Sequence, residues 1–316
     1  MIFFLITILL LIFMLAYIKW AVKVGVVDLP NDRSSHTRPT IRGGGIIFPA
    51  AILMWGVFFD HSSWPFIIAV LLAGGIGFMD DRYNLSQLPR LIVQSIAVLL
   101  ILWEVSLMTE SIWFILIGFV LVTGWLNAFN FMDGINGISV FYAVAVIAGI
   151  YLFIDYIPQI ELSLIYVVMI SLIIFAWFNA RTRAVAFAGD VGSLSLGLIL
   201  AYLVTTLILE TGRWEFILFL SVYGVDTVMT ILHRLTKREN IFEAHRSHLY
   251  QYLANEMGWH HLAVSAIYAL TQFGIILGLY LIESSLWPIY SMSVLASLGL
   301  IYIIGKAVVI RRLGSY

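Results

Sequence analysis

The fold is decided around the stretch Asn127-Ala-Phe-Asn130-Phe-Met-Asp133-Gly134-Ile-Asn136-Gly137, between an apolar run that ends at Phe129 and another that begins at Ile138. It packs amides, a carboxylate and two glycines between hydrophobic segments. An Asp at the centre of a membrane costs roughly 3 kcal/mol. We therefore infer that the chain keeps these groups to hold something polar. A solvated loop made of turn residues is the alternative.

Composition indicates that this chain is surrounded by lipid rather than water. Of its 316 residues 62% are hydrophobic and only 11% charged, and its mean hydropathy is +1.00. Soluble domains carry about 25% charged residues, so the sequence predicts an all-α polytopic membrane protein. The net charge of −1 argues against nucleic acid as a partner, and the lack of cysteine excludes disulfides and thiolate metal sites.

Apolar segments long enough to cross a bilayer need about 20 residues. About eleven such transmembrane helices are expected, near 1–22, 43–59, 65–79, 89–108, 111–129, 137–157, 160–178, 191–209, 214–232, 261–282 and 286–310. The connections that carry unusual polar residues are 23–42, 80–90, 127–137, 179–193 and 233–260. We expect a single domain, 1–316, with these as its active-site loops.

Basic residues predict the orientation. The remaining connections between the predicted helices are short, and of the 17 Lys and Arg residues only Arg213 lies in one of them. By the positive-inside rule the polar loops and the C-terminus are cytoplasmic, and the N-terminus is outside. All five polar loops would then meet at one membrane surface, within reach of a cytosolic solute and a lipid.

The first two polar loops suit phosphate chemistry. Arg33, His36, Arg38 and Arg42 form a cationic stretch that can bind phosphate oxygens, or that only sets topology. Asp80-Asp81 repel each other unless a cation or a proton intervenes. Two adjacent carboxylates can serve a metal and a substrate, or simply end a solvated helix.

The next two loops add amides and a carboxylate. Asn127, Asn130 and Asp133 recur every three residues, which places them on one broad helical face. Asp190 lies between Gly189 and Val191-Gly192-Ser193, where a helix start would put a carboxylate beside free backbone N–H groups. Mg²⁺ prefers one or two carboxylates together with substrate phosphates. The alternative for Asp190 is a helix cap.

The last loop contains His245-Arg246-Ser-His248. Histidines at i and i+3 would share a helix face, and with Arg246 between them they could hold a diphosphate. As a zinc site the pair is weak because no third ligand has suitable spacing. Asp226 lies within an apolar segment and is expected to have a polar partner.

Together these motifs resemble the polyprenyl-phosphate N-acetylhexosamine-1-phosphate transferases, the bacterial glycosyltransferase family 4. The resemblance covers about residues 25–255, and the motifs stand in the family's order. They are Asp28-x-Pro30-x-x-Arg33-x-x-His36, Asp80-Asp81, Asn127-x-x-Asn130-x-x-Asp133-Gly134-x-x-Gly137, Gly189-Asp190-x-Gly192-Ser193 and the His245/His248 loop.

The resemblance implies a multi-pass enzyme of the bacterial inner (plasma) membrane with a cytoplasmic active site. It would transfer an N-acetylaminosugar 1-phosphate from a UDP-sugar to undecaprenyl phosphate and release UMP, the first step of a surface polysaccharide. It implies Mg²⁺, or Mn²⁺ in its place, on Asp190. The implied roles are catalysis for Asp80, Asp81, Asp133, His245 and His248, and substrate binding for Arg33, His36, Asn127, Asn130 and Arg246.

Two departures bear on the donor sugar. The His loop lacks the fuller histidine cluster of the muramoyl-pentapeptide branch, and Asn179-Ala-Arg-Thr-Arg lacks a proline often found there. The donor sugar can be UDP-GlcNAc or one of its 6-deoxy relatives, and the sequence is compatible with a homodimer. A secondary transporter, with carboxylates near mid-membrane, and an intramembrane aspartyl protease using Asp190 and Asp226 are the rival functions.

Overall fold

A computed structural model describes residues 1–30, 35, 38–60, 62–240 and 246–313. The long helices are α1 (Ile2–Val24), α2 (Ile47–Phe58), α3 (Trp64–Tyr83), α4 (Gln87–Glu104), α5 (Ile112–Met132), α6 (Ile138–Leu152), α7 (Leu162–Asn179), α8 (Gly189–Thr211), α9 (Ser221–Thr236), α11 (His261–Leu281) and α12 (Trp287–Leu313). Shorter elements are α10 (Leu249–Gln251), the strands β1 (Val27–Asp28) and β2 (Thr40–Ile41), and the helical turns η1 (Gly44–Ile46), η2 (Leu107–Thr109), η3 (Ile154–Tyr156), η4 (Trp214–Leu220), η5 (Tyr252–Glu256) and η6 (Ser284–Leu286).

Apolar helices dominate the molecule, which confirms the all-α polytopic membrane class. In the part of the chain that the structure describes, nine helices are long and apolar enough to cross a membrane. Gly44–Phe58 and Ile138–Leu152 are shorter apolar helices. Each of the eleven predicted segments therefore corresponds to a helix, while the number of spans and their orientation stay predictions.

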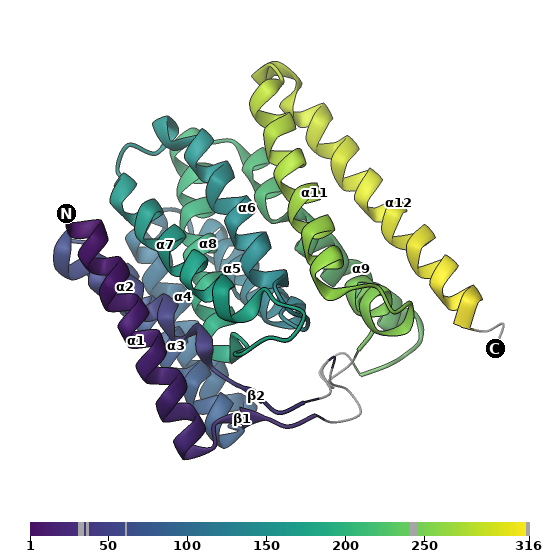
Figure 1. The fold of residues 1–316 in the computed structure, drawn as a ribbon. Helices are drawn as coiled ribbons and strands as arrows, with labels where there is room; N and C mark the ends of the chain where they lie inside the picture. Colours follow the sequence, from purple (N-terminus) through teal and green to yellow (C-terminus); the bar gives the residue numbers. More distant parts are fainter. Residues whose placement is uncertain (31–34, 36–37, 61, 241–245, 314–316) are drawn as a thin grey trace.

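Helix α8 lies at the centre of the bundle (Figure 1). Within its most apolar window 89% of the residues are buried by protein, against 22% for α1 and 17% for the span that contains α12. Small residues such as Gly192 and Gly197 allow neighbouring elements to approach closely. Because α8 is held on all sides, its N-terminus is a fixed point for the polar loops.

The polar loops gather at one end of the bundle, opposite the N-terminus of α1 (Figure 1). The strands β1 and β2 pair antiparallel there, and Ile41 forms a parallel bridge with Ala186. The N–H groups of Gly44 and Gly45 donate to the carbonyls of Phe187 and Ala188. The loop 23–42 is thus joined by backbone bonds to the segment that leads into α8.

Two local predictions are corrected. Asp80 and Asp81 lie inside the last turns of α3, because the helix continues to Tyr83, whereas the sequence predicted its end before them. His248 has extended backbone and lies just before α10 rather than within a helix, and the other histidine of the predicted pair lies outside the described residues. The Nδ1 atom of His248 lies 3.2 Å from Oδ1 of Asp226.

Candidate active site

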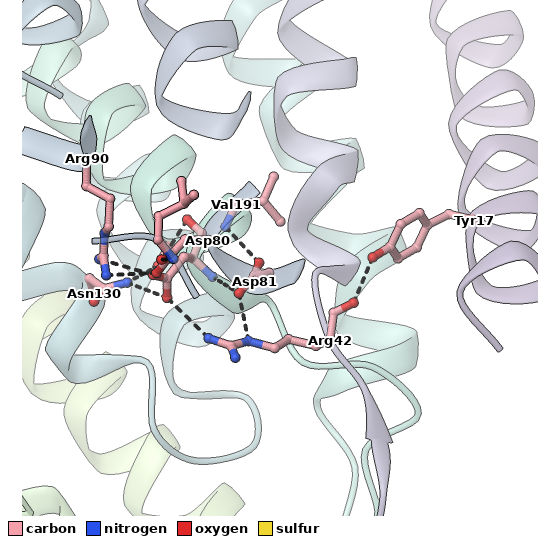
Figure 2. Close-up of polar contacts among 10 residues, drawn as sticks. Tyr17, Arg42, Asp80, Asp81, Arg90, Asn130 and Val191 are labelled. Atoms are coloured by element: carbon pink, nitrogen blue, oxygen red, sulfur yellow. Dashed lines mark hydrogen bonds and ion pairs between the residues drawn. The ribbon is translucent and has the colours of Figure 1, made fainter. Parts of the chain in front are cut away.

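Three carboxylates from two helices meet where α3 ends and α8 begins (Figure 2). The Asp81 carboxylate accepts the backbone N–H groups of Asp190 and Val191, at 2.9 and 3.2 Å, and its side chain is fully buried. A carboxylate suits this place because the first N–H groups of a helix have no partners within it. Asp81 therefore holds the start of α8, and with it Asp190, against α3.

Gly189 makes this close approach feasible. It has a φ of +69°, a left-handed backbone conformation that residues other than glycine rarely adopt. A Cβ atom there would collide with the Asp81 carboxylate and lie 2.8 Å from the backbone nitrogen of Gly43. The glycine before Asp190 is therefore required by the packing of three chain segments at one point.

Two arginines bridge the carboxylates. Arg42 Nε lies 2.7 Å from Asp81 Oδ1, and Arg42 Nη2 lies 3.9 Å from Asp190 Oδ1. Arg90, at the start of α4, places Nη1 2.7 Å from Asp80 Oδ2 and Nη2 3.1 Å from Asp190 Oδ2. Burial opposes the charge on Arg42, but the carboxylates of Asp81, Asp190 and Asp28 outweigh it and raise the arginine's pKa.

The amide–carboxylate stretch reaches the same cluster from α5. Asn130 Nδ2 donates to Asp190 Oδ1 at 3.1 Å and to the Ser193 hydroxyl at 2.8 Å. Asp133 ends α5 and accepts the Ser139 hydroxyl at 2.6 Å. Burial raises the pKa of Asp133 to about 6; the Ser139 bond opposes this rise and the charge of Asp190 adds to it.

A pocket of about 360 Å³ opens beside the cluster. Its lining contains Asp28, Ser35, Arg42, Asn130, Asp133, Gly134, Ile135, Asn136, Asn179, Phe187, Ala188, Gly189, Asp190 and Gln251. Four of the five polar loops, all except 80–90, thus contribute residues to one cavity. Among the predicted site residues, Asn130, Asp133 and Asp190 line it, while Asp80 and Asp81 lie behind Asp190.

The other predicted site residues lie elsewhere. Asn127 donates to the Thr123 carbonyl of its own helix, at 2.9 Å, and does not line the pocket. Arg246 pairs with Glu256 at 3.8 Å, and His248 is buried beside Asp226. Arg33, His36 and His245 lie outside the described residues. The catalytic and substrate-binding roles assigned to these six residues stay predictions.

The donor set fits a divalent cation held jointly with substrate. Among the described residues, no three His, Asp or Glu side chains form a group that could hold a metal alone. Asp190 offers carboxylate oxygens at the pocket wall, with its side chain 16% exposed. Mg²⁺ takes one or two carboxylates and completes its shell with phosphates and water, which is what such a position can supply.

Some residues of the site were not among the predicted site residues. Arg90 stands nine positions beyond Asp81, across a turn, so no helical or strand period connects the two. Asn179 joins two pocket segments by accepting the Gly137 N–H and donating to the Ala186 carbonyl. A charged residue at the start of an apolar helix was the one available signal for Arg90.

This arrangement defines a class: a membrane-embedded enzyme with carboxylates and arginines converging on a polar pocket, suited to phosphate-bearing substrates. The family model for glycosyl transferase family 4 matches residues 63–208. Within that group the chain is similar to the polyprenyl-phosphate N-acetylhexosamine-1-phosphate transferases.

Relatives across bacteria are similar over most of the chain. A probable undecaprenyl-phosphate N-acetylglucosaminyl 1-phosphate transferase of Bacillus subtilis is 25% identical over 288 residues, covering 84% of this chain and 80% of the relative. An undecaprenyl-phosphate alpha-N-acetylglucosaminyl 1-phosphate transferase of Salmonella typhi is 29% identical, covering 73% and 70%. A phospho-N-acetylmuramoyl-pentapeptide-transferase of Francisella philomiragia is 27% identical, covering 77% and 80%.

Proposed function

We propose that this protein transfers an N-acetylaminosugar 1-phosphate from a UDP-sugar to undecaprenyl phosphate, releasing UMP. A phosphate oxygen of the lipid forms a bond to the donor's sugar-linked phosphorus, and the bond from that phosphorus to UMP breaks. The product is a lipid-linked sugar diphosphate. The names of the relatives from Bacillus subtilis and Salmonella typhi support this acceptor and this transferred group.

The two-sidedness of the carboxylate cluster is the observation that carries the proposal. Arg42 lines the polar pocket, whereas Arg90 binds the same Asp190 from α4 and is not part of the pocket lining. The neighbours of Arg90 on α4, Leu88 and Leu91, are exposed apolar residues that suit contact with lipid. One guanidinium can thus serve a soluble diphosphate and the other a lipid phosphate.

The roles of the aspartates follow from this division. Asp81 is fully buried and caps α8, so it positions Asp190 and Arg42. Asp80, which pairs with Arg90, orients the acceptor phosphate or takes its proton. Asn130 and Asp133 bind the donor in the pocket. A divalent cation on Asp190 supplies charge neutralisation for the diphosphate.

The donor and the setting are part of the proposal. UDP-GlcNAc or a 6-deoxy relative is the donor, since the His loop lacks the fuller cluster of the muramoyl-pentapeptide branch. The enzyme lies in the bacterial inner membrane, faces the cytoplasm and starts a surface polymer such as O-antigen, capsule or teichoic acid. A transporter would need carboxylates near mid-membrane, whereas Asp80, Asp81 and Asp190 lie at helix ends.

The test is a UMP-release assay in membranes with undecaprenyl phosphate, Mg²⁺ or Mn²⁺, and a panel of UDP-sugars. We expect release with an N-acetylaminosugar donor, dependent on lipid and on divalent cation. Asp190→Asn should lower the rate by about 100-fold or more, and Asp155→Asn, at an exposed position beyond the far end of α6, should not. Full activity of Asp190→Asn, or release without lipid, contradicts the proposal.

A further inference from the structure

The buried carboxylate of Asp226, in α9, is a hub outside the carboxylate cluster. Its side chain is 4% exposed. Its oxygens accept hydrogen bonds from the backbone N–H groups of Leu249 and Tyr250, at 3.1 and 3.4 Å. They also accept hydrogen bonds from Nδ1 of His248, at 3.2 Å, and from the hydroxyl of Tyr268, at 2.6 Å. A buried carboxylate persists only with such partners. It therefore fixes the start of α10 to α9 and α11.

Helix α12 supports the same segment from the other side. Lys306 is 3% exposed, and its Nζ atom donates to the Ser247 carbonyl at 3.2 Å and to the Tyr302 hydroxyl at 2.7 Å. Tyr302 in turn lies 2.9 Å from the hydroxyl of Thr230, one helical turn from Asp226. The segment that enters α10 is thus held by three helices.

Tyr250 connects this anchored segment to the donor pocket. Its ring is fully buried, and its hydroxyl donates to the Phe131 carbonyl at 2.9 Å. That carbonyl is in the last turn of α5, where carbonyls lack partners within the helix. The hydroxyl also packs against Gly134, whose Cβ, if added, would collide with it. Tyr250 therefore contacts the turn that carries Asp133, but does not line the pocket itself.

We propose that Tyr250, anchored by Asp226, is a positioning residue that sets the turn 131–137 for donor binding. The inference rests on the proposed function, in which Asp133 of this turn binds the UDP-sugar. A displaced turn would weaken donor affinity while the carboxylate cluster, held separately by Arg42 and Arg90, keeps its geometry. The transfer rate at saturating donor then changes less than the affinity does.

Tyr290 is a matched control for Tyr250. Its hydroxyl donates to the Ile275 carbonyl at the same 2.9 Å, and it packs against Gly278 as Tyr250 packs against Gly134. Both bonds join a tyrosine hydroxyl to a helix carbonyl, but Tyr290 joins α12 to α11 away from the pocket. Tyr290→Phe therefore removes the same chemistry without touching the donor site.

The first experiment measures backbone hydrogen exchange in the detergent-solubilised full chain, without substrate. Tyr250→Phe should speed exchange in residues 131–137 by about two- to tenfold, the loss expected for one hydrogen bond. Asp226→Asn should act on the same residues, and Tyr290→Phe on residues 275–282 only. Unchanged exchange in 131–137, or equal acceleration in all peptides for Tyr250→Phe, overturns the proposal.

The second experiment is a double-mutant cycle on donor affinity. Gly134→Ala forces a methyl group against the Tyr250 hydroxyl, and Tyr250→Phe removes that hydroxyl. We expect each single variant to raise the KM for the UDP-sugar more than it lowers kcat, and the double variant to recover part of the loss in Gly134→Ala. The pair Gly278→Ala and Tyr290→Phe should leave the KM unchanged. Strictly additive effects overturn the proposal.

The two proposals fail in different ways. If the unmodified protein releases no UMP with any donor, the proposed function fails, and the exchange experiment still decides whether Tyr250 orders the turn. If the unmodified protein is active and Tyr250→Phe keeps both its KM and its exchange pattern, the positioning role fails alone.

Discussion

At the scale of single residues, the shared carboxylate of Asp190 decides how the site works. Arg42, in the connection after β2, and Arg90, in α4, reach it at different distances, 3.9 and 3.1 Å. Each arginine also holds a second carboxylate, Asp81 or Asp80. The guanidinium fork suits this bridging because it presents several donors in a fixed plane. A lysine would supply the charge without the second contact.

Lysine substitutions should therefore separate the two substrates. We expect Arg42→Lys to raise the KM for the UDP-sugar and Arg90→Lys to raise the KM for undecaprenyl phosphate, each by about tenfold or more. Initial rates of UMP release, with one substrate varied at a time, measure both. Arg82→Lys is the control, since Arg82 stacks on Trp20 and Tyr83. Equal effects of Arg42→Lys and Arg90→Lys on both substrates would contradict the two-sided site.

Asp133 links pH to stability. Burial raises its pKa to about 6, above the value of about 3.9 for an unperturbed Asp. The folded state therefore binds this proton more tightly than the unfolded state does. The stability that Asp133 contributes is fully present below about pH 4 and is lost as the pH rises through about 6.

Asp133→Asn should remove this pH dependence. We expect its melting temperature at pH 7 to equal or exceed that of the unmodified protein, and its stability to change less between about pH 4 and pH 7. UMP release should fall, because the pocket loses a carboxylate that binds the donor. Thermal unfolding in detergent across this pH range measures the effect, with Asp155→Asn as the control. A large loss of melting temperature in Asp133→Asn would show that the ionised form stabilises the fold.

At the scale of secondary-structure elements, the contact between α3 and α8 positions the carboxylates. Gly77 lies where the backbone of α8 approaches α3, and a Cβ there would sit 2.5 Å from the carbonyl carbon and oxygen of Asp190. Both atoms are backbone, so they cannot rotate away. The spacing of Asp80, Asp81 and Asp190 therefore depends on a glycine one turn before the aspartate pair.

Two alanine substitutions in the same helix should have opposite consequences. Gly77→Ala must push α8 away and should cost about 1–3 kcal/mol of stability, with a loss of UMP release. Gly75→Ala meets nothing within 4 Å and should be neutral or slightly stabilising, since alanine favours helix. Thermal unfolding and initial rates of the two variants give the comparison. Similar behaviour of both would show that the α3–α8 contact yields easily.

At the scale of the whole molecule, the described parts of the polar loops and the end of α12 lie at one end and the N-terminus at the other (Figure 1). The concentration of Lys and Arg in the polar loops predicts that their end is cytoplasmic. The chain contains no cysteine, so single cysteines can report on sidedness without a background signal.

The orientation can be tested with a membrane-impermeant maleimide. We expect Thr109→Cys, in the connection before α5, to be labelled in intact cells, and Lys237→Cys, after α9, to be labelled only once the membrane is permeabilised. Both side chains are exposed in the structure. Labelling of Lys237→Cys in intact cells would reverse the topology and place the pocket outside.

Some properties of this protein follow from the sequence alone because they are local. The length and hydrophobicity of each span predict the all-α membrane class, and every predicted span corresponds to a helix. Helix α8 begins at Gly189, so Asp190 lies at a helix start as its motif predicts. The order of the polar motifs was sufficient to predict the family, since each motif lies within a few consecutive residues.

Other properties depend on pairs that are far apart in the chain, and only the tertiary structure decides them. The bond from the Asp190 N–H to Asp81 joins residues 109 positions apart. The spacing of the His loop gave no sign that His248 is buried against Asp226 of α9. No periodicity connects Arg90 to Asp190 or Tyr250 to Phe131. Such contacts depend on how helices pack, and packing is a property of whole surfaces that no short motif encodes.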